Sequence, residues 1–333
     1  MMPDDSSPYI NAVLLFKLLT SWLLFLYSSA SFLLNSLVSN MLDIPLLSRI
    51  LVCLLLCCLF NAFNAEESGN GILDKEVEAV KKLKGPLLLG KVAIVTGGAS
   101  GIGRSVCQVL DREGAQVIIA DINDAKANET LGLLKGGNHT AIHTDVSVRA
   151  NVTYLFEQVE EIYGTVDIVI NSAGIIQRPS LFTNTSEAEF DKVISVNLRG
   201  TYLITQAAVT MMLENENATG RTILNIASVS GKGGRRSLSS YSASKGAVIS
   251  FTKSVALEVA LKGIRVNTIL PGFTDTPMTQ GTPEAVRAGI IGEIPMGRIA
   301  TPLEMSEVIV FMCGPRSTYM VGSAVLVSGG TFL

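Results

Sequence analysis

From Lys91 onward, short apolar runs rich in β-branched residues alternate with longer segments that have a helical pattern. Strands that are apolar on both faces and alternate with helices are typical of a parallel sheet covered by helices on both sides. Seven such runs are present, at residues 91–97, 115–121, 140–145, 166–174, 221–228, 264–272 and 323–330. We therefore predict an α/β fold, a Rossmann-type doubly wound parallel sheet of seven strands. It should form a single domain over residues 91–333, with no separate substrate domain.

The composition permits a large core and excludes several functions. Hydrophobic residues make up 48% of the chain and charged residues 17%, and the formal net charge is −3. A nucleic-acid-binding protein normally presents a basic patch, so we predict no nucleic-acid partner. His139 and His143 are the only histidines, and the cysteines show no metal-binding spacing. We therefore expect neither a histidine triad nor a metal site.

The first 65 residues differ from the rest of the chain. Residues 18–42 and 50–65 carry no charged side chain. We predict that residues 1–65 form a hydrophobic membrane anchor, with the endoplasmic reticulum favoured, and that residues 66–90 form a linker. A mitochondrial transit peptide should be Arg-rich and poor in acidic residues, which this segment is not. Two alternatives stay open: a signal sequence that begins at Met41, and a misassigned start that leaves the segment out of the mature protein.

Two features point to opposite sides of a membrane. Lys81, Lys82 and Lys84 follow the apolar run and suit a cytosolic domain. Asn-X-Ser/Thr sequons suit a lumenal domain, and they occur at Asn128, Asn138, Asn151, Asn184 and Asn217. Both topologies therefore stay open.

A glycine-rich turn follows the first predicted strand, at residues 96–103. Glycines there let the backbone approach a pyrophosphate, and the amides at the start of the next helix point at the phosphates. Asp121 ends the second strand, where a carboxylate accepts the ribose hydroxyls and repels a 2′-phosphate. Neither Ser100 nor Ile122 offers a basic side chain for such a phosphate. We therefore predict NAD(H) as the cofactor rather than NADP(H).

Tyr241 and Lys245 lie four residues apart, on one face of a predicted helix. A free tyrosine has a pKa near 10, and a nearby ammonium together with a nicotinamide ring should lower it enough for acid–base catalysis. Ser228 ends the fifth strand, and Asn197 lies in a predicted helix after the fourth. All four side chains should meet at the carboxyl ends of the strands, where ligands bind in such sheets.

These motifs together resemble the short-chain dehydrogenase/reductase family across residues 91–333. The resemblance rests on the glycine-rich turn, on Asn171-Ser172-Ala173-Gly174, on the Asn–Ser–Tyr–Lys tetrad and on Pro271, Gly272 and Thr276. It implies that Tyr241 is the acid–base, that Lys245 binds the nicotinamide ribose and tunes Tyr241, that Ser228 holds the substrate oxygen and that Asn197 holds a water in a proton relay. The implied cofactor contacts are Gly97, Ser100, Gly101, Ile102, Gly103, Asp121, Ile122, Asp145, Val146, Asn171, Ala173, Gly174, Tyr241, Lys245, Pro271, Gly272, Thr274 and Thr276. The chain departs from the broader family at Ser172 and Ser328, where Asn and Asp are common, and in its apolar N-terminal segment.

Within that family the chain is most similar to the branch of 3-oxoacyl-ACP reductases that includes the type 8 estradiol 17-beta-dehydrogenases. The similarity lies in residues 137–147, 191–208, 272–280, 294–298 and 325–333. It implies interconversion of 3-oxoacyl and (3R)-3-hydroxyacyl thioesters of ACP or CoA, with 17-beta-hydroxysteroids as further substrates. It also implies an acyl carrier protein as a partner, a homo- or heterotetramer, and a mitochondrial matrix location as the alternative to the membrane. Two other functions stay open: a membrane-anchored retinol or steroid dehydrogenase, and a structural subunit of a hetero-oligomeric reductase.

Overall fold

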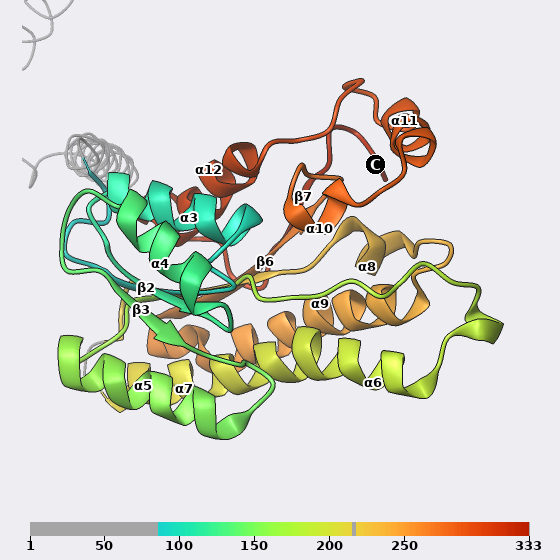
Figure 1. Cartoon of the computed structure of the whole chain (residues 1–333). Coiled ribbons are helices and arrows are strands. Elements are labelled where there is room, and N and C mark those ends of the chain that lie inside the picture. The colour runs from blue at the N-terminus through green and yellow to red at the C-terminus, as the bar shows by residue number, and fades with distance from the viewer. Residues whose placement is uncertain (1–85, 215–217, 333) are drawn as a thin grey trace, which may run out of the picture. The chain divides into compact units, whose positions relative to one another are not determined.

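The computed structural model describes residues 86–214 and 218–332, and every structural statement below concerns these residues (Figure 1). The predicted anchor, residues 1–65, and most of the predicted linker lie outside the described residues. None of the described helices combines the length and the apolarity that a membrane crossing requires.

The described residues form one parallel sheet whose strand order is β3-β2-β1-β4-β5-β6-β7. The seven predicted strands and their parallel arrangement are thus confirmed. β1 lies in the interior of the sheet, where Val95 pairs with Ile119 of β2 on one side and Ile170 of β4 on the other. The strands are β1 (Val92–Thr96), β2 (Gln116–Asp121), β3 (Thr140–His143), β4 (Ile168–Asn171), β5 (Arg221–Ile226), β6 (Ile264–Pro271) and β7 (Ala324–Val327).

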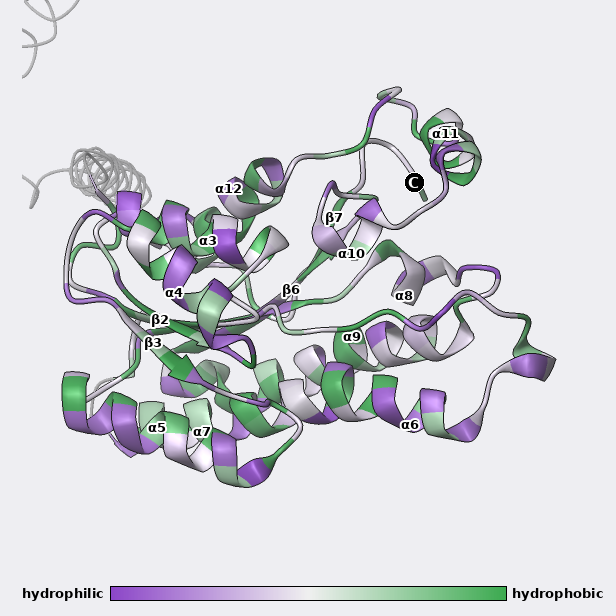
Figure 2. Ribbon diagram, viewed as in Figure 1, coloured by the Kyte–Doolittle hydropathy of each residue, from purple (hydrophilic) through white to green (hydrophobic). Residues whose placement is uncertain are grey.

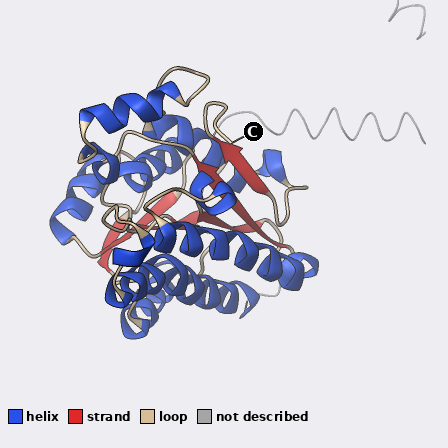
Figure 3. Ribbon diagram, turned by 90° about the vertical axis from the view of Figure 1, so that its right-hand side faces the viewer, coloured by secondary structure: helices blue, strands red, loops and turns tan. Residues whose placement is uncertain are grey.

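Helices cover both faces of this sheet, as Figures 1 and 3 show. One face carries α3 (Gly101–Arg112), α4 (Asp124–Leu133) and α12 (Pro302–Cys313). The other carries α5 (Arg149–Tyr163), α7 (Thr201–Glu214) and α9 (Ser239–Val259). The shorter helical segments are α6 (Glu187–Ile194), α8 (Val229–Gly233), α10 (Pro277–Gln280), α11 (Glu284–Gly292), η2 (Phe182–Asn184), η3 (Ser195–Gly200), η4 (Ala260–Lys262) and η5 (Pro315–Ser317).

A separate hydrophobic cluster fills the space on each face of the sheet. Ile94 and Ile118 point toward α5 and α7, where they meet Leu155 and Ile204. The alternate strand residues, such as Ile119, point toward α3 and α12. Figure 2 shows the resulting hydropathy, with apolar strands between helices whose outer surfaces are largely hydrophilic. Residues on both faces of β1, β4, β5 and β6 are buried, which is why these strands read as unbroken apolar runs.

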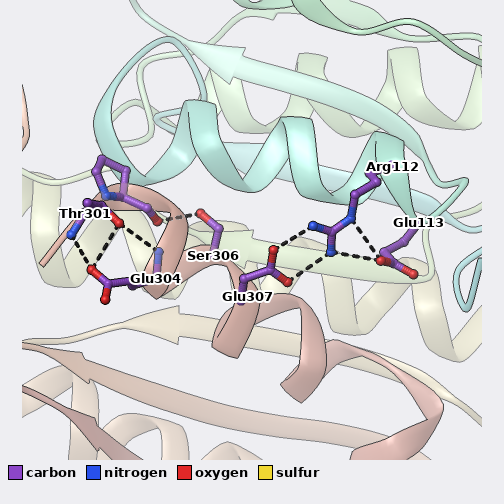
Figure 4. A network of polar contacts seen from close by, with 7 residues as sticks. Arg112, Glu113, Thr301, Glu304, Ser306 and Glu307 are labelled. Carbon is purple, nitrogen blue, oxygen red and sulfur yellow. Dashed lines mark hydrogen bonds and ion pairs between the residues drawn. The ribbon is translucent and has the colours of Figure 1, made fainter.

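An ion pair joins α12 to α3, and a capping box stabilises the start of α12 (Figure 4). Arg112 near the end of α3 donates to both carboxylate oxygens of Glu307, at 2.6 and 3.0 Å. Thr301 and Glu304 form a reciprocal capping box at the start of α12. The pair between Arg112 and Glu307 is solvent-exposed, so burial of the apolar faces contributes more to this helix packing than the charges do.

The packed domain begins slightly earlier than the sequence indicates. Leu88 lies in the predicted linker, but it is buried at 3% exposure and its amide donates to the carbonyl of Glu113. The sheet's topology reverses between β1 and β4, because β1 leads outward to β2 and β3 while β4 leads the other way. A crevice at the carboxyl ends of such strands is the expected ligand site.

Candidate active site

A cavity of about 1150 Å³ lies at the carboxyl ends of the strands. Most of the predicted site residues line it: Gly97, Ser100, Ile102, Asp121, Ile122, Asp145, Val146, Ala173, Gly174, Ser228, Tyr241, Lys245, Pro271, Gly272, Thr274 and Thr276. Four predicted residues do not line the cavity: Gly101, Gly103, Asn171 and Asn197. These four pack or hydrogen-bond beneath the residues that line it, as their contacts below indicate.

The glycine-rich turn is shaped by close backbone packing. Gly97 has a φ of +66° and lies against the backbone of Ala173, so that a Cβ would come within 2.8 Å of Ala173 Cα. A Cβ on Gly103 would come within 2.2 Å of the Gly97 carbonyl oxygen. Ser100 caps α3 without using its side chain as a capping acceptor, so its hydroxyl remains available to a ligand. The loop thus forms a cradle that fits a pyrophosphate.

Backbone amides fix the orientation of the Asp121 carboxylate. One oxygen accepts from the amide of Ala99 at 3.0 Å, and the other accepts from the amide of Asn123 at 2.9 Å. Each carboxylate oxygen keeps a second lone pair for a ribose hydroxyl. Ile122 is 62% exposed and apolar, so its side chain offers no positive charge to a 2′-phosphate.

Asp145 and Val146 line the cavity beyond β3. One oxygen of the Asp145 carboxylate accepts from the amide and the hydroxyl of Ser147, at 2.9 and 2.6 Å. Asp145 therefore also stabilises its own turn. Val146 is buried against Gly200, where a Cβ would come within 2.6 Å of the valine side chain.

Thr96, which the sequence analysis missed, holds the loop that follows β4. Its hydroxyl oxygen accepts from the amides of Ser172 and Ala173, at 3.1 and 3.2 Å. Asn171 is buried beneath this loop and donates to Asn225 at 2.8 Å, so it links β4 to β5 and does not face the cavity. The position of Thr96, as the first residue of the glycine-rich turn, was the available signal.

Asn197 lies in η3, a single π-helical stretch between α6 and α7. Its side chain is fully buried, accepts from the amide of Ile175 at 2.8 Å and donates to the Ile175 carbonyl at 2.9 Å. It also donates to the hydroxyl of Ser244 at 3.0 Å. π-Helical turns are frequent at functional sites. Here the turn aims Asn197 at the loop beside Gly174, where a Cβ would come within 3.3 Å of Asn197 Oδ1 and 3.5 Å of Lys245 Nζ.

Ser228 and Tyr241 form a hydrogen-bonded pair at the centre of the cavity. Ser228 caps α8, and its oxygen accepts from the amide of Ser230. Gln177 was also missed: it is buried, and its side-chain oxygen accepts from the amide of Tyr241 at 2.9 Å. Nothing in the local sequence around Gln177 marks it, because the contact joins a loop to the start of α9.

Burial governs the protonation of Tyr241 and Lys245. It raises the pKa of Tyr241 above 10, and the hydrogen bond from Ser228 offsets only part of that rise. For the protein groups alone, the cost of burying a phenolate thus exceeds their stabilising effect. The lowering of this pKa by an ammonium together with a nicotinamide ring stays a prediction. Burial also lowers the pKa of Lys245 to about 8. Its ammonium lies 5.8 Å from the centre of the Tyr241 ring and donates to the Ile226 carbonyl at 2.7 Å.

The loop after β6 closes the cavity over the glycine-rich turn. Thr276 packs against Gly101, where a Cβ would come within 3.3 Å of the threonine side chain. Thr274 is buried, and its hydroxyl donates to the Gly272 carbonyl at 3.1 Å. Ser328, at a position where the broader family commonly has Asp, donates to the Thr331 carbonyl at 2.6 Å.

A family profile described as enoyl-(acyl carrier protein) reductase matches residues 97–331, which is most of the chain. The chain belongs to the short-chain dehydrogenase/reductase family. The predicted family, fold class and enzyme class, a nicotinamide-dependent oxidoreductase, are thereby confirmed.

Relatives of this short-chain dehydrogenase/reductase include enzymes of acyl metabolism. It is 41% identical to human (3R)-3-hydroxyacyl-CoA dehydrogenase, over 74% of this chain and 97% of the relative. It is 38% identical to 3-oxoacyl-[acyl-carrier-protein] reductase of Thermotoga maritima, over 73% of this chain and 98% of the relative. A 3-ketoacyl-(acyl-carrier-protein) reductase from Brucella melitensis, crystallised with NADH, is 34% identical with a TM-score of 0.70, covering 74% of this chain and 100% of that one.

Proposed function

We propose that this chain is an NAD(H)-dependent oxidoreductase that interconverts 3-oxoacyl and (3R)-3-hydroxyacyl thioesters. The main support is the pairing of Tyr241 with Ser228 beside Lys245, inside a cavity that also contains the carboxylate of Asp121. The names of the relatives supply the substrate class, since they include a hydroxyacyl-CoA dehydrogenase and a 3-oxoacyl-ACP reductase.

The described residues fit NAD(H) at each part of the dinucleotide. Gly97 and Gly103 leave room for the pyrophosphate, and a Cβ at either would clash with backbone. Asp121 is oriented for the ribose hydroxyls and would repel a 2′-phosphate. Lys245 and Gly174 lie at the opposite end of the cavity, where the nicotinamide ribose would be held. When bound, NADH supplies the hydride for the carbonyl carbon of the substrate.

The chain's own residues handle the proton and the orientation of the substrate. Ser228 and Tyr241 both donate hydrogen bonds to the substrate oxygen, and Tyr241 gives up its proton to that oxygen during reduction. Because burial disfavours the phenolate, a positive charge close to Tyr241 is needed to stabilise it, and Lys245 provides one. Asn197 holds the loop at Ile175 and keeps one lone pair of Oδ1 for a water in the proton relay.

We also propose that the enzyme is a tetramer, homomeric or with a partner subunit. Two apolar faces of the described structure remain exposed. One includes Phe311 of α12 with Tyr319 and Val321 before β7, and the other includes Leu257 of α9 and Leu261 of η4. Exposed apolar patches mark interaction sites, and a tetramer with two kinds of contact would cover two distinct faces.

The membrane location remains a proposal of ours from the sequence. The charge-free stretches 18–42 and 50–65 would anchor the chain, with the endoplasmic reticulum favoured over the mitochondrial matrix. Cell fractionation with an antibody to the catalytic domain, with and without glycosidase, tests both the location and the side of the membrane.

The substrate class is tested by NADH oxidation with the full-length chain. We expect turnover of 3-oxobutyryl-CoA at a kcat/KM of about 10⁴ M⁻¹s⁻¹ or more, the usual range for an enzyme's own substrate. Retinal and a 17-oxosteroid serve as comparison substrates. Preference for retinal would support the alternative dehydrogenase, and no turnover of any substrate would support a structural subunit.

A further inference from the structure

Apart from Lys245, the charged residues that line the cavity are unevenly distributed between its two sides. Asp121 and Asp145 lie where β2 and β3 end, on the side proposed for the adenosine. Lys192, Arg235, Arg236 and Glu293 belong to segments around the proposed substrate side: α6, the α8–α9 connection and the residue after α11. Three of these four side chains are basic, although the whole chain has a formal net charge of −3. The substrate side therefore has a local positive charge in an acidic protein.

Arg235 and Arg236 differ in their contacts. Arg235 donates to the carboxylate of Glu293 at 3.2 Å, so these two charges neutralise each other across the cavity. Arg236 is exposed, lines the same cavity and makes no ion pair or side-chain hydrogen bond with another described residue. Among the described residues of this rim, the guanidinium of Arg236 and the exposed ammonium of Lys192 are therefore two cations without an ion pair.

The backbone next to Arg236 is held in place by the fold. Ser237 has a φ of +67°, a conformation that non-glycine residues rarely adopt. Its carbonyl accepts from the amide of Ser180 at 3.1 Å, which ties this connection to the loop after β4. Residues in such conformations gather at ligand sites, where the surrounding structure maintains them.

The same cavity has an apolar wall beside this basic rim. Ile175, Leu238, Val286, Ile290 and Ile294 line it, and Phe332 near the chain end packs on Gly233. A ligand that fits both parts has an apolar group and, several bonds away, an anion. A retinoid or a neutral steroid has no such anion.

We propose that Arg236, assisted by Lys192, binds a phosphate of the pantetheine-bearing part of an acyl thioester. The inference rests on the proposed function and names the part of the substrate that the basic rim recognises. A guanidinium forms paired hydrogen bonds to phosphate, which suits Arg236. Both CoA and a carrier protein's prosthetic group have this chemistry.

The test compares thioesters that share an acyl group and differ in phosphate. NADH-dependent reduction is measured for the full-length chain with 3-oxobutyryl-CoA, with the 3-oxobutyryl carrier-protein thioester and with the N-acetylcysteamine thioester, which has no phosphate. For Arg236→Ala we expect KM to rise about tenfold on a phosphate-bearing substrate, with kcat within about twofold. The N-acetylcysteamine reaction should stay within about twofold of wild type, and it also reports whether the variant is folded. Lys135→Ala, which removes an exposed charge outside the cavity, should leave all three reactions unchanged.

The outcomes separate the two claims. An effect on the CoA thioester, on the carrier-protein thioester or on both, without an effect on the N-acetylcysteamine thioester, supports the inference. An effect confined to one of the two also identifies the source of the phosphate. Equal effects on all three thioesters, or no effect on any, overturn it while the proposed function holds. If the wild type reduces none of the thioesters, the proposed function fails and the inference with it.

Discussion

Tyr241 and Lys245 are the two titratable groups on which the chemistry depends, and burial acts on them in opposite directions. It raises the pKa of the phenol and lowers the pKa of the ammonium to about 8, because it disfavours the charged form of each. A phenolate and an ammonium are thus both costly alone and stabilise each other at a centroid distance of 5.8 Å. The charged forms of Tyr241 and Lys245 therefore depend on each other.

The pH dependence of stability tests the burial of Lys245. Its pKa is about 8 in the folded protein and 10.5 as a free group, so between these values the unfolded chain binds more protons. Stability from this group therefore rises with pH across that window, by up to about 3 kcal/mol. We expect the melting temperature of wild type relative to Lys245→Met to rise between pH 8 and pH 10. Lys135→Met, at an exposed position, should give a pH-independent difference, and a flat curve for Lys245→Met as well would refute the assignment.

Asp121 should determine the choice of nicotinamide coenzyme. Asp121→Ala combined with Ile122→Arg removes a repulsion and adds a forked donor for a 2′-phosphate. We expect the ratio of kcat/KM for NADPH over NADH to rise at least about tenfold. Steady-state kinetics with each coenzyme measure this ratio. Wild-type enzyme that already uses both equally would show that Asp121 does not discriminate.

At this scale the sequence predicted residues that have a fixed place in a motif and missed those that act through tertiary contacts. Asp121 and Tyr241 line the cavity as expected. Gln177 and Thr96 support the site through hydrogen bonds between distant segments, and the partners in these bonds cannot be found from local sequence. The effect of burial on the pKa of Tyr241 was also beyond the sequence, because it depends on how deeply the phenol is buried.

Among the elements, α3 depends most on close approach to its neighbours. It starts where Gly103 packs on the carbonyl of Gly97, and its apolar face packs beside α12 over the sheet. The helices and strands themselves followed from periodicity and β-branched runs. The π-helical turn at Asn197 did not follow from the pattern, because the sequence predicted an ordinary helix there. Asn197 binds the loop at Ile175, and local periodicity does not encode that contact.

Substituting two helical glycines separates packing from helix propensity. A Cβ at Gly103 would lie 2.2 Å from a backbone oxygen, whereas a Cβ at Gly132 in α4 would have no atom of another described segment within 4 Å. We expect Gly103→Ala to lower the melting temperature and to weaken NADH binding at least about tenfold. Gly132→Ala should keep NADH binding and leave stability unchanged or raise it by up to about 1 kcal/mol. Thermal melts and NADH fluorescence titrations measure both, and equal behaviour of the two variants would contradict the close packing described.

At the scale of the whole molecule, the edge strand β7 and the exposed apolar faces remain partly uncovered in the single chain. The residues of β7 are only partly covered, and β7 pairs with β6 alone. Exposed edges and apolar patches are usually covered in stable proteins. Association of several chains would cover them, which agrees with the proposed tetramer.

Charged substitutions on the two apolar faces test this assembly. Phe311→Arg lies on α12 and Leu261→Arg on η4, directly after α9, so each should disrupt a different contact. We expect light scattering to give a tetramer for wild type and smaller species for each variant. A wild-type chain that is an active, stable monomer at micromolar concentration would refute the proposal.

Replacing the phenol of Tyr241 by Phe removes one oxygen atom and keeps the ring and its packing. The measurement is kcat for NADH-dependent reduction of 3-oxobutyryl-CoA, together with NADH affinity from fluorescence titration. We expect kcat to fall about 10²–10⁴-fold, the usual contribution of general acid–base catalysis, with NADH affinity close to wild type. A Tyr241→Phe enzyme that keeps more than about a tenth of the wild-type rate would contradict the assignment of Tyr241 as the proton donor.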